Sequence, residues 1–140
     1  MVGIPYDDLS SWTGPYPPEI FAGQMEKVAG GFKEGISLLE EASTKSPDSL
    51  RPSVAAEIRY ADTVRINYLS CANQTRFLLA RDEYLRPETT PERKAELADQ
   101  MKRIAEEEIG LAKELYLRTL EDSTIGFEST NHYFYLPNDL

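Results

Sequence analysis

The sequence predicts an all-α protein, an antiparallel bundle of three long helices with aromatic-rich loop segments at both ends. Apolar residues recur at helical spacing over three long stretches, and short Pro- and Ser-rich connectors separate these stretches. Helices of roughly 25 to 35 residues joined in this way favour antiparallel neighbours in a bundle about 40–50 Å long. The expected order is a loop-rich lead at 1–17, a bundle at 18–122 with helices over about 18–42, 50–85 and 91–121, and an aromatic C-terminal strap at 123–140.

The first helix is expected to begin near Pro18 or Glu19, because proline is tolerated in a first turn and a carboxylate suits the N-terminal dipole. Three glycines at 30, 31 and 35 lower its helix propensity by about 1 kcal/mol each relative to alanine. They indicate either close approach of another element or a kink. The apolar stripe that predicts the helix consists of Phe21, Met25, Val28, Phe32, Leu39 and Ala42.

The third helix has a clear start signal, with Thr90 as the predicted N-cap and Pro91 at the first helical position. We expect it to turn one broad apolar face inward and a face rich in Glu, Lys and Arg outward. The apolar face consists of Leu97, Met101, Ile104, Ala105, Ile109, Ala112, Leu115, Tyr116 and Leu120.

The middle helix differs from its neighbours because it is apolar almost all round. From Ile66 to Ala80 the sequence carries a single charge, Arg76. A row of uncharged polar side chains at helical spacing runs along it, namely Thr63, Asn67, Ser70 and Gln74. Two partner helices do not wrap a third completely, so we expect something else to cover this polar row at an interface. The aromatic ends of the chain, a second copy of the chain, or a neighbouring domain would each serve.

Composition and charge narrow the classes of partner. The chain has 140 residues and a net charge of −9, so it is the size of one domain and repels nucleic-acid backbones and anionic membranes. The start "MVGIPYDDLSSWTG" lacks the basic and apolar regions of a signal peptide, and no apolar run reaches about 18 residues. These features leave the cellular compartment open.

No motif for catalysis, a metal or a cofactor emerges from the sequence. A di-metal bundle site needs Glu-x-x-His motifs on its helices, and the single histidine, His132, lies beyond the last predicted helix. The single cysteine, Cys71, lies among apolar neighbours, where a thiol is usually an inert small hydrophobe. Glu108 is placed toward the apolar face of the third helix without an imidazole partner. We therefore predict no catalytic residue, no metal and no cofactor.

The two aromatic ends are the remaining candidate site. Trp12, Tyr16, Asn131, His132 and Tyr133 would form a sugar-binding pocket if the ends meet, because sugar rings stack on exposed Trp and Tyr side chains. The commoner role of such residues is to anchor a loop on a bundle through their rings and hydrogen-bonding groups. In that reading 123–140 is a strap over the apolar surface that three helices leave open.

Three stretches carry a resemblance to a known class of protein: "YPPEIFAGQMEKVAGGFKEGISLLE", "CANQTRFLLARDEYL" and "DSTIGFESTNHYFYLPNDL". Together they resemble the C-terminal helical segment of large, poorly characterised bacterial proteins with glycoside-hydrolase-like, carbohydrate-active architecture. The resemblance covers most of residues 16–140 and implies a sugar-handling domain upstream. It carries no known chemistry for any single motif, so no catalytic residue is transferred.

These observations lead to one main functional hypothesis and two alternatives. The main hypothesis is a non-catalytic helical accessory domain, a fragment of a larger bacterial carbohydrate-active protein, whose partner is a neighbouring domain; "YLPNDL" at the end is expected to lead into further chain. The first alternative is a free-standing bundle that associates with itself or with another protein. The second is the sugar-binding module formed by the aromatic ends.

Overall fold

Three long helices make up most of the chain in a computed structural model that describes residues 8–11, 13–125, 127–128 and 133–134. They are α1 (Pro18–Lys45), α2 (Arg51–Leu85) and α3 (Pro91–Glu121), with short 3-10 turns η1 (Leu9–Ser11) and η2 (Asp48–Leu50). Two two-residue strands follow α3, β1 (Phe127–Glu128) and β2 (Tyr133–Phe134), which pair in antiparallel register. The prediction of an all-helical fold with three helices is confirmed.

Local sequence signals explain where these helices begin and end. Thr90 caps α3 as predicted, since its side chain accepts a hydrogen bond of 3.2 Å from the Arg93 backbone N–H. The first helix runs to Lys45, beyond the expected end at 42, and Ser46 then turns extended. The extended backbone suits a residue that precedes a proline, Pro47. Arg86, before Pro87, ends α2 in the same way.

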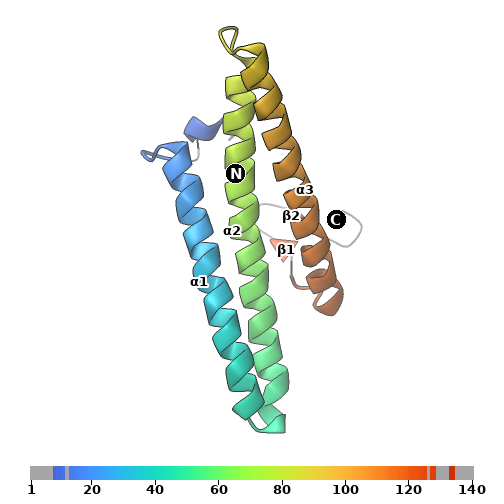
Figure 1. The fold of residues 1–140 in the computed structure, drawn as a ribbon. Helices are drawn as coiled ribbons and strands as arrows, with labels where there is room; N and C mark the ends of the chain where they lie inside the picture. The colour runs from blue at the N-terminus through green and yellow to red at the C-terminus, as the bar shows by residue number, and fades with distance from the viewer. Residues whose placement is uncertain (1–7, 12, 126, 129–132, 135–140) are drawn as a thin grey trace.

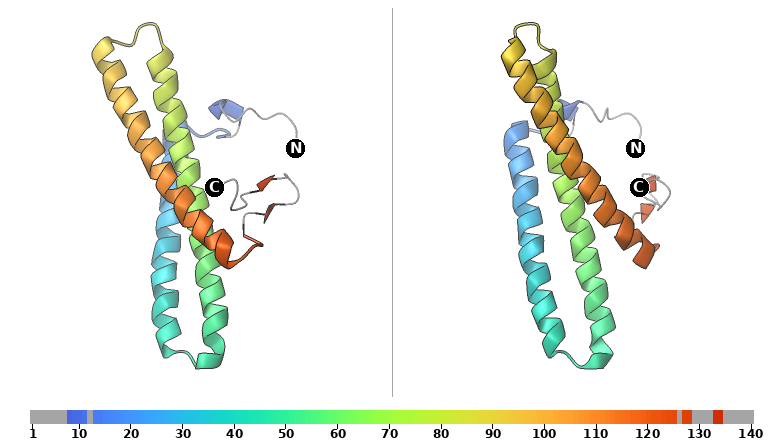
Figure 2. Two further views of the ribbon diagram at one scale, coloured as in Figure 1. Left: turned by 90° about the vertical axis from the view of Figure 1, so that its right-hand side faces the viewer. Right: turned by 45° about the vertical axis from the view of Figure 1, so that its right-hand side comes forward.

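The helices form an open arrangement in which α2 is the shared partner. Figure 1 shows α2 running back alongside α1 from the turn that joins them, and α3 returning along α2 from the opposite end. Both α1 and α3 pack on α2, whereas α1 and α3 make no comparable contact with each other over the described residues. Figure 2 shows α3 crossing α2 and diverging from it toward its C-terminal end. Each outer helix therefore has one main helical neighbour rather than two.

Small side chains are the buried residues of α1, which packs on α2. Ala22 and Ala29 of α1 are almost fully buried, as is Ala72 of α2. The larger residues of the predicted α1 stripe are half-buried or exposed, and the rings of Phe32 and Tyr68 stack with centroids 6.2 Å apart. The fully covered positions of α1 are therefore alanines, whereas the large apolar residues that predicted the helix stay partly accessible.

A compact apolar cluster joins α2 to the end of α3. Ile66 of α2 packs with Leu111 and Leu115 of α3 and with Ile125, which follows α3. The backbone N–H groups of Thr124 and Ile125 both donate hydrogen bonds to Asp122, which turns the chain back so that Ile125 reaches the cluster. The cluster therefore holds the C-terminal half of α3 against α2.

The predicted inward face of α3 is correct only in part. The buried residues of α3 are Leu97, Ile104, Leu111, Leu115 and Thr119. Four other residues of the expected face are exposed, so α2 does not cover that part of α3; they are Ala105, Ile109, Tyr116 and Leu120. The cause is the open arrangement, since one neighbouring helix covers a narrower stripe than a bundle with two neighbours would.

Candidate functional site

The strongest candidate site is an apolar groove between α2 and α3. Its volume is about 480 Å³, large enough for several side chains of a bound molecule. It is lined by Ser70, Asn73, Gln74, Phe77 and Leu78 from α2, and by Ile104, Ala105, Glu108, Ile109 and Ala112 from α3. Apolar walls with a few polar groups are typical of binding sites.

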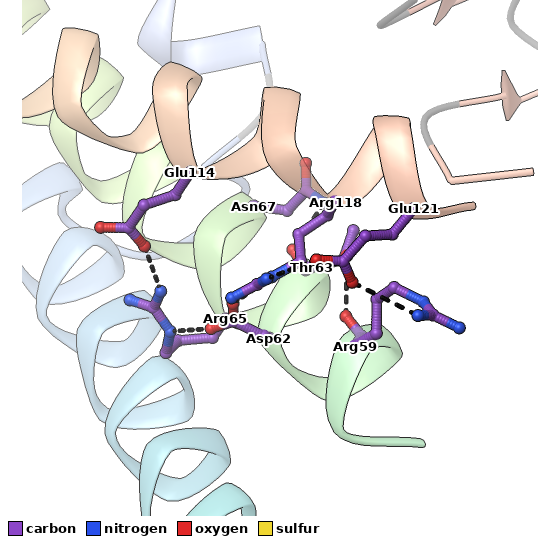
Figure 3. A network of polar contacts seen from close by, with 8 residues as sticks. All are labelled: Arg59, Asp62, Thr63, Arg65, Asn67, Glu114, Arg118 and Glu121. Atoms are coloured by element: carbon purple, nitrogen blue, oxygen red, sulfur yellow. Dashed lines mark hydrogen bonds and ion pairs between the residues drawn. The ribbon is translucent and has the colours of Figure 1, made fainter. Parts of the chain in front are cut away.

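The predicted polar row of α2 divides between this groove and its own helix. Ser70 and Gln74 line the groove. The Thr63 hydroxyl and the Asn67 amide instead donate hydrogen bonds of 2.9 Å to backbone carbonyls one turn earlier, at Arg59 and Thr63. Thr63 and Asn67 lie near the C-terminal half of α3, beside the charged network of Figure 3.

Glu108 is the charged residue of the groove. It is half-buried on α3, and its carboxylate accepts a hydrogen bond from the Ser70 hydroxyl and another of 3.1 Å from the Asn73 side-chain amide. In the part of the chain that the structure describes, no Lys or Arg forms an ion pair with it. The sequence alone places Glu108 near the apolar face of α3, but its two partners come from another helix. Asn73 was not among the predicted residues; it shares a face of α2 with Ser70, three positions earlier, but this spacing does not point to Glu108 as their partner.

A second set of polar residues, drawn in Figure 3, ties α2 to the C-terminal half of α3. The buried Asp62 accepts hydrogen bonds from Arg65 (2.7 Å) and from Arg118 (2.9 Å). Arg65 also forms an ion pair with Glu114, with 2.5 Å between Nη2 and Oε2. Each charged group of this network therefore has a partner of opposite charge. Burial acts to raise the pKa of Asp62, but the two guanidinium groups outweigh it, so this pKa lies below its ordinary value. The network is therefore structural.

A more polar hollow of about 380 Å³ lies where α1, α2 and α3 approach one another. Its arginines include Arg76, which pairs with Glu26 of α1, and Arg93, which holds Glu83 through two hydrogen bonds of 2.7 and 3.0 Å. These two guanidinium groups are already neutralised by carboxylates, so they add little attraction for an anion.

The described residues contain no constellation for nucleophilic or metal chemistry. Burial raises the pKa of the half-buried Cys71 thiol, which keeps it protonated and unreactive near neutral pH. No group of three or more His, Cys, Asp and Glu side chains within the described ranges could hold a metal ion. None of the helices there is both long and apolar enough to cross a membrane.

The aromatic candidate residues fall mostly outside the described part of the chain. Tyr16 is 62% exposed. Trp12, Asn131 and His132 are not among the described residues, and only the backbone of Tyr133 is described, in β2. The sugar-binding pocket and the strap at 123–140 therefore stay predictions. Within 123–140 the structure describes the side chains of residues 123–125, and Ile125 packs against the cluster between α2 and α3.

Comparison with known proteins adds no constraint on the site. No protein-family model, no curated protein and no solved structure matches this chain. The candidate site therefore depends on its own geometry, and the resemblance to carbohydrate-active proteins stays an expectation.

Proposed function

We propose that this chain is a non-catalytic helical docking domain, an antiparallel three-helix unit that receives a helix of a partner in the groove between α2 and α3. The observation that carries the proposal is the uncovered half of the apolar face of α3. There Ile109 is 56% exposed, Tyr116 37% and Leu120 57%. Contiguous exposed apolar surface of this kind marks interaction sites.

The exposed residues form a continuous stripe with the groove. Ala105, Ile109, Ala112, Tyr116 and Leu120 follow one another at spacings of four, three, four and four, which places them on one face of α3. The first three of them also line the groove. At about 1.5 Å per residue the stripe is about 22 Å long, and a partner helix of about 15 residues matches this length.

An amphipathic helix laid into an apolar groove is a recurrent mode of peptide recognition. On this chain such a helix would cover the part of α2 and α3 that α1 does not reach. The resemblance of the sequence to carbohydrate-active proteins favours a neighbouring domain of the same polypeptide as the source of that helix, which would make the chain an accessory domain. A second copy of the chain is the alternative source, because the same apolar face would support self-association.

Nuclear magnetic resonance tests the proposal directly. We expect amphipathic helical peptides of about 15 residues, prepared with their apolar stripes in several registers, to shift the backbone amide signals of Ala105, Ile109 and Ala112. The substitution Ile109→Gln, at an exposed position that should leave folding intact, is expected to weaken binding about tenfold. Leu38→Gln is the matched control, because Leu38 is 67% exposed on α1, away from the groove.

Two results would overturn the proposal. One is the absence of binding by every peptide in the panel. The other is binding that Ile109→Gln and Leu38→Gln weaken equally. Sedimentation velocity of the chain without peptide identifies the source of the helix, since concentration-dependent dimerisation that Ile109→Gln abolishes would assign the groove to a second copy.

A further inference from the structure

Glu108 differs from the other carboxylates that join the helices. Among the described residues, the helical carboxylates that bridge to another helix have an arginine partner, with Glu108 as the exception. Those with an arginine are Glu26, Asp62, Glu83, Glu114 and Glu121. Glu108 bridges α3 to α2 through the neutral donors Ser70 and Asn73.

The apolar surroundings of Glu108 make its lack of an arginine partner important for what can bind in the groove. Phe77 and Leu78 of α2 and Ile104 and Ile109 of α3 line the groove beside it, so the carboxylate lies in a mainly apolar hollow that is open to water. A carboxylate has about four acceptor positions, and the two hydrogen bonds leave acceptor capacity for water. A purely apolar helix entering the groove would exclude that water without replacing it, which is unfavourable for an ionised group.

From this geometry, and resting on the proposed docking function, we infer that Glu108 binds a lysine or arginine carried on the apolar face of the docking helix. A cation there would replace the lost water with a charge-assisted hydrogen bond, the stronger class of such bonds. Its aliphatic stem would lie along the apolar walls while the charged head reaches the carboxylate. The arrangement would repeat, across the new interface, the carboxylate–arginine pairing that joins α2 to α1 and to α3.

The net charge of the chain favours the same occupant. At −9, it attracts a basic segment and repels an acidic one, which raises the rate of encounter with a basic helix. The exposed stripe continues beyond the groove to Tyr116 and Leu120, which favours a polypeptide over a compact organic amine, because a small molecule would leave these two residues uncovered.

Two peptides that differ at one position test the inference. Both are amphipathic helices of about 15 residues in the same register, and the position nearest Glu108 is lysine in one and norleucine, its uncharged analogue, in the other. We expect the lysine peptide to bind about tenfold more tightly by isothermal titration calorimetry at low salt. Glu108→Gln should abolish that preference without weakening the norleucine peptide, while Glu107→Gln, a change at an exposed neighbour, should preserve it.

The outcomes separate this inference from the proposed function. If both peptides bind the groove equally, the inference is wrong and the docking function stands. Should neither bind, the docking function itself fails and the inference with it. Dodecylamine that binds as tightly as the lysine peptide, with the same dependence on Glu108, would assign the site to a small amine and overturn the helical partner. Circular dichroism of Glu108→Gln shows whether any loss is a loss of fold.

Discussion

Among single residues, Asp62 is a buried carboxylate that two arginines neutralise. It is buried between α2 and α3, with Arg65 and Arg118 both bonded to its carboxylate. Replacing it by asparagine removes the buried counter-charge that the two guanidinium groups share, and leaves Arg65 and Arg118 paired only with the more exposed Glu114 and Glu121. We therefore expect Asp62→Asn to lower the free energy of unfolding by about 2 kcal/mol at pH 7, measured by urea denaturation.

The pH dependence of stability follows from the direction of the Asp62 pKa shift. The pKa of Asp62 is lower in the folded protein than its ordinary value of 3.8, so its stabilising contribution is complete above that value. The contribution is lost as the pH falls through the folded pKa, because the carboxyl then protonates. The difference between wild type and Asp62→Asn should shrink below about pH 4. Asp99→Asn, at an exposed position of α3, should change stability little at either pH, and an equal loss in both variants would contradict the assignment.

Within the helical elements, Gly30 of α1 is not required by packing. A β-carbon placed on Gly30 would meet no atom within 4 Å, and the residue is exposed in the middle of the helix. Gly30→Ala should therefore stabilise the protein by about 0.5–1 kcal/mol, through higher helix propensity and a less flexible unfolded chain. A thermal scan followed by circular dichroism would show this as a rise in Tm of a few degrees.

Gly14, in the turn before α1, provides the opposite case. It too has open space around it, but its φ is +61°, in the left-handed region that other residues adopt at a cost. Gly14→Ala should consequently lower stability by about 1 kcal/mol, seen as a fall in Tm. A rise in Tm for this variant as well as for Gly30→Ala would contradict the role given to the backbone conformation.

Across the whole molecule, the return of the chain after α3 closes the interface between α2 and α3. Ile125 is 4% exposed and packs with Ile66, Leu111 and Leu115. Ile125→Ala would leave a cavity in this cluster and is expected to lower the free energy of unfolding by about 3 kcal/mol, measured by urea denaturation. Leu120→Ala is the control, since Leu120 is 57% exposed, and its truncation should change stability by less than about 0.5 kcal/mol. Similar losses in the two variants would mean that Ile125 does not join the core.

The three helices, and the first residues of α1 and α3, are readable from the sequence, because prolines, the Thr90 cap and apolar periodicity act over a few neighbouring residues of the chain. The nearly uncharged stretch of α2 and its polar row also predict cover for α2 beyond its two partner helices, and that cover stays a prediction.

The sequence does not predict which faces of the helices are covered, because this depends on how the helices pack. Burial of an apolar residue on α3 depends on where the axis of α2 lies, so periodicity marked Ile104 and Ile109 as one face but did not separate the buried first residue from the exposed second. Likewise, the partners of Glu108 lie 35 and 38 positions away along the chain, beyond the reach of any local signal. Local interactions specify helices, whereas the crossing of α3 over α2 leaves the groove open and brings Ser70 and Asn73 to Glu108.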